Sequence, residues 1–168
     1  MTETAKRCAR CGCRDLINVK GRTRTYQIAG LRRVTLHHPP VSRCANCGYR
    51  DAVIRDMESL RRAVLNALIR KRARLIPREI RFLRKHLGWS GTEFSVYMGQ
   101  TPETVSRWVN GRTAMGVTAD RLLRLLVAMN TTGAELSLKR FRVVASEPVG
   151  ATPLAVEFRD GQWNAMPE

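Results

Sequence analysis

Apolar residues in the second half of the chain recur three or four positions apart, which is the period of a helix with one buried face. Between residues 56 and 73 this pattern predicts a helix that links two domains. A second helix is expected to begin at Pro77, because a proline at the first helical position loses no hydrogen bond. The two apolar faces comprise Met57, Leu60, Val64, Ala67 and Leu68, and then Ile80, Leu83 and Leu87.

Another apolar stretch predicts a helix that Thr118 caps and that ends between Asn130 and Gly133. Its apolar face is wide and comprises Leu122, Leu123, Leu125, Leu126 and Met129. Two explanations of this width stay open. The surplus leucines form a two-fold interface, as operator-binding proteins often need, or all of them pack into one thick core.

Two shorter helices are predicted between these longer ones. Ser90 and Glu93 have the spacing of a capping box, in which each side chain binds a backbone N–H of the other residue. Phe94 and Met98 lie four positions apart and share one face of the helix that begins there. Gly99 is expected to end this helix, because glycine adopts the left-handed conformation found at helix ends.

The next helix has Thr101 as N-cap and Pro102 at its first position, and the pair Asn110-Gly111 stops it. Its inner face is predicted to hold Val105, Trp108 and Val109, and its outer face Glu103, Thr104 and Arg107. Two capped helices around a glycine predict a helix-turn-helix over residues 87–111, whose second helix enters the major groove of DNA. The alternative is an ordinary helical hairpin.

The first 54 residues alternate weakly between apolar and polar positions. Strands are expected at residues 16–19, 23–28 and 33–36. A sheet with so little apolar content needs an additional constraint in order to fold.

Four of the five cysteines supply such a constraint, since they form two Cys-x-x-Cys pairs, Cys8 with Cys11 and Cys44 with Cys47. Glycine follows each pair and relieves a tight turn. Four thiolates complete the tetrahedral shell of one structural Zn²⁺ per chain. A redox function is the main alternative, but it predicts a single active pair. Cys13 is interpreted as a free thiol, although it could replace Cys11 as a ligand.

The net charge of +16 and the isoelectric point near 11.1 indicate a polyanionic partner. Residues 1–54 contain 11 basic and 3 acidic side chains, residues 55–133 contain 15 and 6, and residues 134–168 contain 4 and 5. The sequence shows neither a membrane-spanning stretch nor the apolar segment of a signal peptide. We therefore expect a cytoplasmic, nucleoid-associated protein that does not contact a membrane.

Three further segments allow more than one interpretation. The basic run 70–74 either contacts phosphates or forms a solvated helix end. His37 and His38 are expected to be solvated, because the cysteines already fill a metal's coordination shell. The tail from residue 134 either forms strands, with Leu136 and Leu138 in one segment and Asp160-Gly161 as a hairpin turn, or is disordered.

The predicted fold class is α+β, with a small four-cysteine zinc-stapled β domain followed by an all-α helix-turn-helix domain. The expected divisions are a zinc-knuckle domain at 1–54, a helical linker at 55–76, a helix-turn-helix domain at 77–133 and the tail at 134–168. The DNA-contacting residues are predicted to be Ser90, Thr92, Thr101, Glu103, Thr104, Arg107 and Arg112.

The two cysteine pairs, the linking helix and the segment that ends in SRWVNG together resemble the MqsA/YgiT-type family of antitoxins and regulators. The resemblance covers residues 8–130 and includes an XRE-like helix-turn-helix. It implies that the zinc domain binds a partner toxin, which in the type member is an mRNA-cleaving ribonuclease. It also implies that the C-terminal domain dimerises on double-stranded operator DNA and represses its own operon.

Arg107 matches a base-reading position of that family, while Glu103 stands where the type member has asparagine. Glutamate accepts a hydrogen bond from cytosine whereas asparagine pairs with adenine, so the operator sequence does not carry over. Gly91 replaces a glutamine that contacts phosphate, and Thr92 or the N–H groups capped by Ser90 are expected to substitute for it.

These patterns predict a transcriptional repressor that acts as the antitoxin of a type II toxin-antitoxin system. The alternative is a stand-alone zinc-containing regulator without a toxin. An enzyme acting on nucleic acid is disfavoured, because no carboxylate–histidine constellation accompanies the cysteines and four thiolates leave no open metal position.

Overall fold

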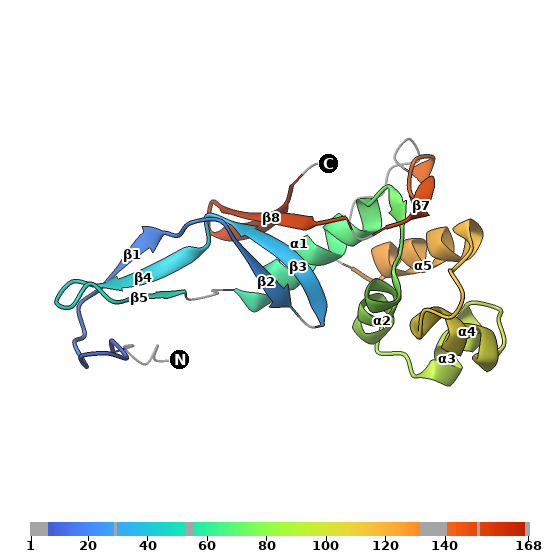
Figure 1. The fold of residues 1–168 in the computed structure, drawn as a ribbon, viewed down its shortest axis with the longest axis horizontal. Coiled ribbons are helices and arrows are strands. Elements are labelled where there is room, and N and C mark those ends of the chain that lie inside the picture. Colours follow the sequence, from blue (N-terminus) through green and yellow to red (C-terminus); the bar gives the residue numbers. More distant parts are fainter. Residues whose placement is uncertain (1–6, 29, 53–55, 132–140, 151, 167–168) are drawn as a thin grey trace.

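The computed structural model describes residues 7–28, 30–52, 56–131, 141–150 and 152–166. The molecule is elongated, with a small sheet at one end and a group of helices at the other (Figure 1). A second sheet and one long helix occupy the middle. The mixed α+β class expected from the sequence is confirmed.

The end sheet has the strand order β1-β4-β5 and is antiparallel. It is built from β1 (Leu16–Lys20), β4 (Pro40–Cys44) and β5 (Arg50–Ala52). Cys44 is opposite Leu16, and Pro40 is opposite Lys20. The cysteine end of β4 is therefore far from the end at which the chain leaves β1 for the middle sheet.

The middle sheet has the strand order β2-β3-β8-β9. It combines β2 (Arg24–Ile28) and β3 (Leu31–His37) with β8 (Leu154–Arg159) and β9 (Gln162–Ala165) from the tail. β3 and β8 are parallel, with Val34 opposite Leu154. The tail is thus an integral part of the sheet that begins in the N-terminal region.

Asp160 and Gly161 join β8 to β9, and both have positive φ, at 53° and 79°. This is the conformation that a two-residue hairpin turn requires. The expected hairpin at this position is present, whereas Leu136 and Leu138 lie outside the described residues.

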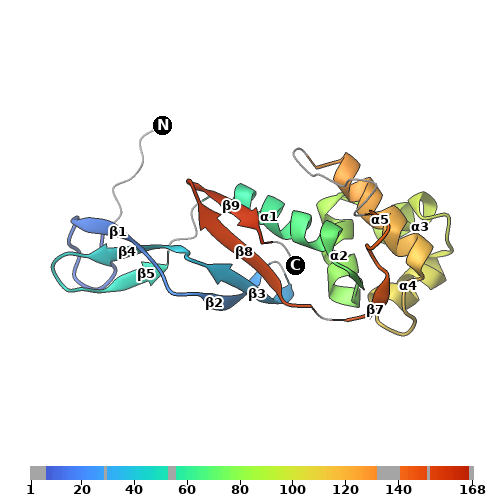
Figure 2. The same cartoon turned by 90° about the horizontal axis from the view of Figure 1, so that it is seen from above.

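Helix α1 (Met57–Arg70) covers one face of the middle sheet. Figure 2 shows it running alongside β8 and β9. Leu60, Val64 and Leu68 are fully buried, as are Val34 and Val156 in the sheet, so the segment expected to be a linker contributes to the core. The helix ends at Arg70, before the predicted residue 73, because the chain then extends into β6 (Ala73–Arg74), which pairs with β7 (Glu147–Val149).

The structure further describes the helices α2 (Pro77–His86), α3 (Gly91–Tyr97), α4 (Pro102–Val109) and α5 (Val117–Met129). Their shared core includes Leu83, Phe94, Val105, Trp108 and Leu123. Within the described ranges, no helix has the length and apolarity that crossing a membrane requires.

The predicted cap of α5 was wrong. Gly116 is the N-cap, with extended backbone and no side-chain hydrogen bond, and Thr118 lies inside the first turn. The carbonyl of Gly116 already accepts the N–H of Asp120 at 2.9 Å. The helix therefore begins at Val117, and Thr118 is already a helical residue.

Within the basic run, Lys71 differs from both interpretations because it is fully buried, whereas Arg72 is exposed. Lys71 Nζ donates to both carboxylate oxygens of Glu79, at 2.8 and 2.7 Å, and to the carbonyl of Gly150 at 2.6 Å. A buried ammonium group is tolerated only when it is paired and hydrogen-bonded in this way. Lys71 therefore joins the end of α1 to α2 and to the tail.

Arg124 of α5 is fully buried as well and pairs with Asp120, with Nε 2.6 Å from Oδ1. Its guanidinium also donates to the backbone carbonyls of Leu68, Lys71 and Ala73. Carbonyls at the end of a helix lack partners within the helix. Arg124 supplies these partners and thereby ties α5 to the C-terminal end of α1.

Candidate functional site

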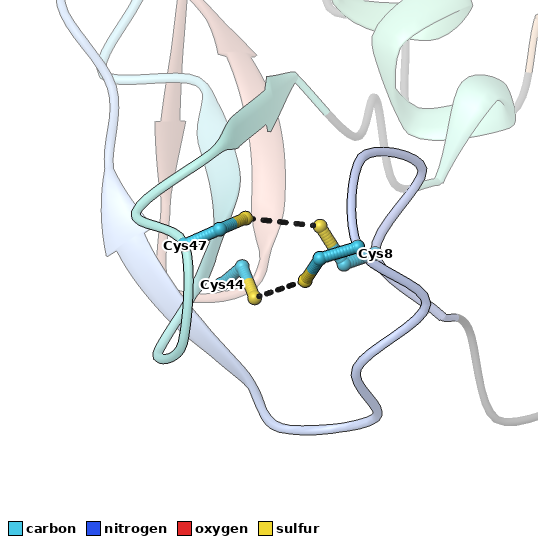
Figure 3. Close-up of side chains that lie close together, drawn as sticks. Cys8, Cys44 and Cys47 are labelled. Carbon is cyan, nitrogen blue, oxygen red and sulfur yellow. Dashed lines mark hydrogen bonds between the residues drawn. The ribbon is translucent and has the colours of Figure 1, made fainter.

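The four cysteines of the two Cys-x-x-Cys pairs come together at the free end of the small sheet. Their sulfur atoms all lie within 4.8 Å of one another. The Sγ atoms of Cys8 and Cys47 are 3.5 Å apart, and those of Cys11 and Cys44 are 3.6 Å apart. Figure 3 shows the sulfurs of two separate chain segments pointing toward each other.

Each pair is shaped by a turn that its glycine completes. Gly12 donates its N–H to the carbonyl of Cys8 at 2.9 Å, and Gly48 donates to Cys44 at 3.0 Å. Both glycines have positive φ, at 70° and 68°, a conformation that other residues rarely adopt. The turns direct two thiols per segment toward a common centre.

The surroundings of the sulfurs perturb their ionisation unequally. The backbone N–H of Cys47 lowers the pKa of the Cys44 thiol to about 6, which favours the thiolate. The backbone N–H of Cys13 acts in the same direction on Cys11, but the neighbouring sulfur of Cys47, together with burial, raises the pKa of Cys11 to about 12. Several thiolates so close together need a cation to stabilise them all.

A metal ion fits this donor set. Four soft sulfur ligands from two tight turns are the arrangement of closed, structural metal sites. Cys13 lies outside the cluster, and its Sγ accepts the backbone N–H of Asp15 at 3.4 Å. His37 also lies outside the cluster, with Nδ1 3.3 Å from the Thr23 hydroxyl.

The helix-turn-helix is assembled by local capping, as its sequence predicted. Ser90 Oγ accepts the N–H of Glu93 at 3.1 Å, and Glu93 Oε2 accepts the N–H of Ser90 at 2.8 Å. Gly99 has a φ of 59° and ends the first helix of the unit. Thr101 Oγ1 accepts the N–H of Thr104 at 3.2 Å and starts the second.

Helix α4 buries Val105 and Trp108 and leaves its opposite face exposed. On that face Arg107 Nη2 lies 2.6 Å from Glu103 Oε1, and the two side chains are 55% and 74% exposed. An exposed ion pair of this kind contributes little to stability. Both side chains are accessible from solvent.

Two further residues of this helix lie beside Glu103 and Arg107. Thr104 is only half-exposed, and its hydroxyl lies 2.9 Å from that of Thr101. Ser106, which sequence reasoning missed, is exposed beside Arg107, and Asn110 Nδ2 donates to its Oγ at 3.3 Å. The spacing of three positions from Glu103 is the signal that would have identified Ser106.

The other predicted DNA contacts lie on the surface around α4. Ser90, Thr92, Thr101 and Arg112 are all exposed. Arg112 follows α4 directly, and its N–H donates to the carbonyl of Arg107 at 2.9 Å. The structure thus brings these side chains to the same part of the molecule as Glu103 and Arg107.

The position of α4 is set by contacts with α2. Arg81 Nε donates to the carbonyl of Val109 at 2.8 Å. Gly111 has a φ of 74°, and a Cβ at this position would lie 3.1 Å from Pro77 Cγ. The positive φ favours glycine at this position, and a larger residue would also require Pro77 to shift slightly.

Comparison with known proteins identifies one part of this architecture. Residues 80–136 match the sequence model of a family described as helix-turn-helix. No curated protein and no solved structure matches the chain. The match spans most of α2 and all of α3, α4 and α5, and families of this XRE type are DNA-binding regulators rather than enzymes. The chain carries a helix-turn-helix domain typical of DNA-binding transcriptional regulators.

Proposed function

We propose that this protein is a sequence-specific transcriptional repressor that reads operator DNA with α4. The observation that carries the proposal is the face of α4 with the exposed Glu103 and Arg107 side chains, opposite the buried Val105 and Trp108. Glutamate accepts from cytosine, and arginine donates to guanine. The i,i+4 ion pair places the Glu103 and Arg107 side chains next to each other on this face.

The metal in the proposed site is one Zn²⁺ per chain with a structural function. Cys8, Cys11, Cys44 and Cys47 would hold it, and their number leaves no position open for a substrate. The ion would join the N-terminal loop to β4 and the turn after it. When bound, it supplies folding energy to a sheet that has few buried apolar side chains.

A homodimer is the proposed DNA-binding form. Leu125 and Met129 on α5 are 41% and 75% exposed, so the surplus apolar residues of this helix are not all absorbed by the core. A two-fold dimer would place two copies of α4 in successive major-groove turns. Operator binding also implies a cytoplasmic, nucleoid-associated location.

We further propose that the repressor is an antitoxin of a type II toxin-antitoxin system. The support is the resemblance of the two cysteine pairs and the helix-turn-helix, in this order, to MqsA/YgiT-type proteins. The zinc-holding end would bind the toxin, an mRNA interferase-like protein, while the helices bind the operator. Figure 1 shows these two parts at opposite ends of the molecule, which leaves room for both partners.

Base reading is tested by Arg107→Ala on an operator selected from random duplexes by binding to the zinc-loaded protein. We expect a loss of about 1–3 kcal/mol on the selected operator and a much smaller loss on random duplex. Arg159→Ala on β8 removes another exposed arginine that pairs with a carboxylate on its own element. It serves as the matched control and should change neither affinity by more than about 0.5 kcal/mol. Equal losses of Arg107→Ala on both duplexes would reject base readout by this residue.

The antitoxin function is tested by pull-down of the tagged full-length chain from its host. A small protein recovered in stoichiometric amount, which inhibits growth when expressed alone and is neutralised by this chain, supports it. Recovery of operator DNA without such a protein favours a stand-alone regulator instead.

A further inference from the structure

A hollow of about 250 Å³ lies where the end sheet meets the middle sheet. Four of the residues that line it are Arg22 just before β2, Arg24 and Tyr26 of β2, and Arg50 of β5. Three smaller or apolar residues complete the lining, Gly21, Pro39 and Val41. None of the four clustered cysteines is among the residues that line this hollow.

The charge of this hollow is of one sign. None of the described lining residues is acidic, and the three arginines are exposed. Surface arginines on most proteins are interspersed with acidic side chains. Here the cations converge on one concavity, which is the arrangement that attracts a polyanion.

A fourth arginine extends the charge along the end sheet. Arg43 of β4 is directly opposite Arg50 of β5, and both are exposed. Val41, which lines the hollow, is two residues before Arg43 and therefore shares its face of the sheet. Like charges opposite each other destabilise a sheet, and an anion lying across the two strands would remove this repulsion. Arg22, Arg24, Arg43 and Arg50 are named the arginine row below.

We infer that the arginine row is a second nucleic-acid contact and binds the phosphodiester backbone. Guanidinium groups donate pairs of hydrogen bonds to phosphate oxygens. Tyr26 supplies an aromatic ring within the same hollow, and basic grooves that track a nucleic-acid strand combine cations with aromatic side chains. A row of separate cations fits a chain of phosphates better than a single small anion.

This contact does not depend on base reading by α4. The arginine row lies on β2, β4 and β5 and the loops beside them, toward the end of the molecule opposite α4 (Figure 1). It would add affinity without sequence preference, because phosphate contacts position a protein but do not specify bases.

The test compares two triple variants of the full-length, zinc-loaded protein. The first is Arg22→Gln, Arg24→Gln and Arg50→Gln. The matched control is Arg32→Gln, Arg142→Gln and Arg159→Gln, which removes the same charge at exposed positions outside the hollow. Binding of fluorescein-labelled random duplex and random single strand is measured by anisotropy over a range of salt concentrations.

We expect the first variant to reduce the slope of log affinity against log salt by about 2–3 on at least one probe, since each lost phosphate contact removes about one unit. The probe that shows the change identifies the strand form. The control should change the slope by less than about half a unit. The single variant Arg50→Gln should lower it by about one, which keeps the test valid if the triple variant loses zinc.

Equal slopes for the two triple variants would overturn the inference, because total charge would then explain the effect. Polyglutamate serves as a third probe, which represents an acidic protein segment. The inference would also be overturned if the first variant kept its binding of both nucleic-acid probes but lost its binding of polyglutamate, and the arginine row would then be assigned to an acidic protein segment. Arg107→Ala tests base reading separately. If Arg107→Ala weakens binding of the selected operator but the first triple variant keeps the wild-type salt slope, this inference fails while base reading by α4 stands.

Discussion

Single residues in this protein perform tasks that depend only on their near neighbours in sequence. Gly12 and Gly48 complete the two cysteine turns with positive φ. Ser90 and Glu93 cap one another at the start of α3. Each of these features was predicted from the sequence, because a cap or a tight turn involves only a few consecutive residues.

The capping box makes a prediction about pH. The backbone N–H and hydroxyl of Ser90 hold the pKa of Glu93 below its ordinary value of 4.5. The folded state therefore takes up this proton less readily than the unfolded chain, so the contribution of Glu93 is complete above pH 4.5 and is lost as the pH falls through the lowered pKa. Glu93→Gln should flatten this part of the stability profile, measured by urea unfolding on both sides of that pH.

Ser90→Ala provides the companion measurement. It removes the N-cap of the same helix and should lower the free energy of unfolding by about 1 kcal/mol at neutral pH. The capping contribution would be contradicted if the free energy of unfolding of the wild-type chain and of Glu93→Gln fell by the same amount below pH 4.5.

Helices and strands are joined here by buried charges that their own sequences do not reveal. Arg124 shares the buried face of α5 with Leu123 and Val127, although it is charged, and binds carbonyls at the end of α1. Lys71 belongs to a run that looks like a basic surface, yet it is buried on Glu79. Whether an arginine or lysine is paired inside depends on which elements pack around it, and this information is not local.

Removing the buried arginine tests its contribution to the junction between α1 and α5. Arg124→Met leaves the Asp120 carboxylate and several backbone carbonyls without their partner. We expect the free energy of unfolding to fall by about 3–5 kcal/mol, the usual effect of breaking a buried ion pair. Denaturant unfolding measures it.

Arg159→Met is the matched control, because this arginine makes an exposed ion pair with Glu157. It should change the free energy of unfolding by at most about 1 kcal/mol. Similar values for Arg124→Met and the control would show that the buried cation is not a structural link.

At the scale of the whole molecule, segments that are far apart in the sequence lie next to each other in the same sheet. β8 from the tail pairs with β3, and α1 packs on the sheet they share. The divisions at 1–54, 55–76, 77–133 and 134–168 stay a prediction as folding units, but the middle sheet contains strands from the first and last of them. The end sheet with the cysteines is a separate sheet.

Loss of the metal is therefore expected to loosen one end of the molecule. Cys44→Ser should abolish zinc retention, measured by metal analysis, and increase hydrogen exchange in β1, β4 and β5. The middle sheet should stay protected, because Val34, Leu36 and Val156 are buried in the main hydrophobic core, which does not include the cysteines. Operator affinity should persist, and its loss together with the metal would show that the two ends are coupled.

Local sequence patterns were sufficient for the helix-turn-helix, the two cysteine turns, the hairpin at Asp160-Gly161 and the basic charge, since capping, turn geometry and ligand spacing act over a few residues. Contacts between distant segments placed β8 beside β3, buried Lys71 and Arg124, and gathered Arg22, Arg24 and Arg50 around one hollow. No short-range rule specifies such contacts. They follow from the free energy of burying apolar faces and pairing charges across the complete fold.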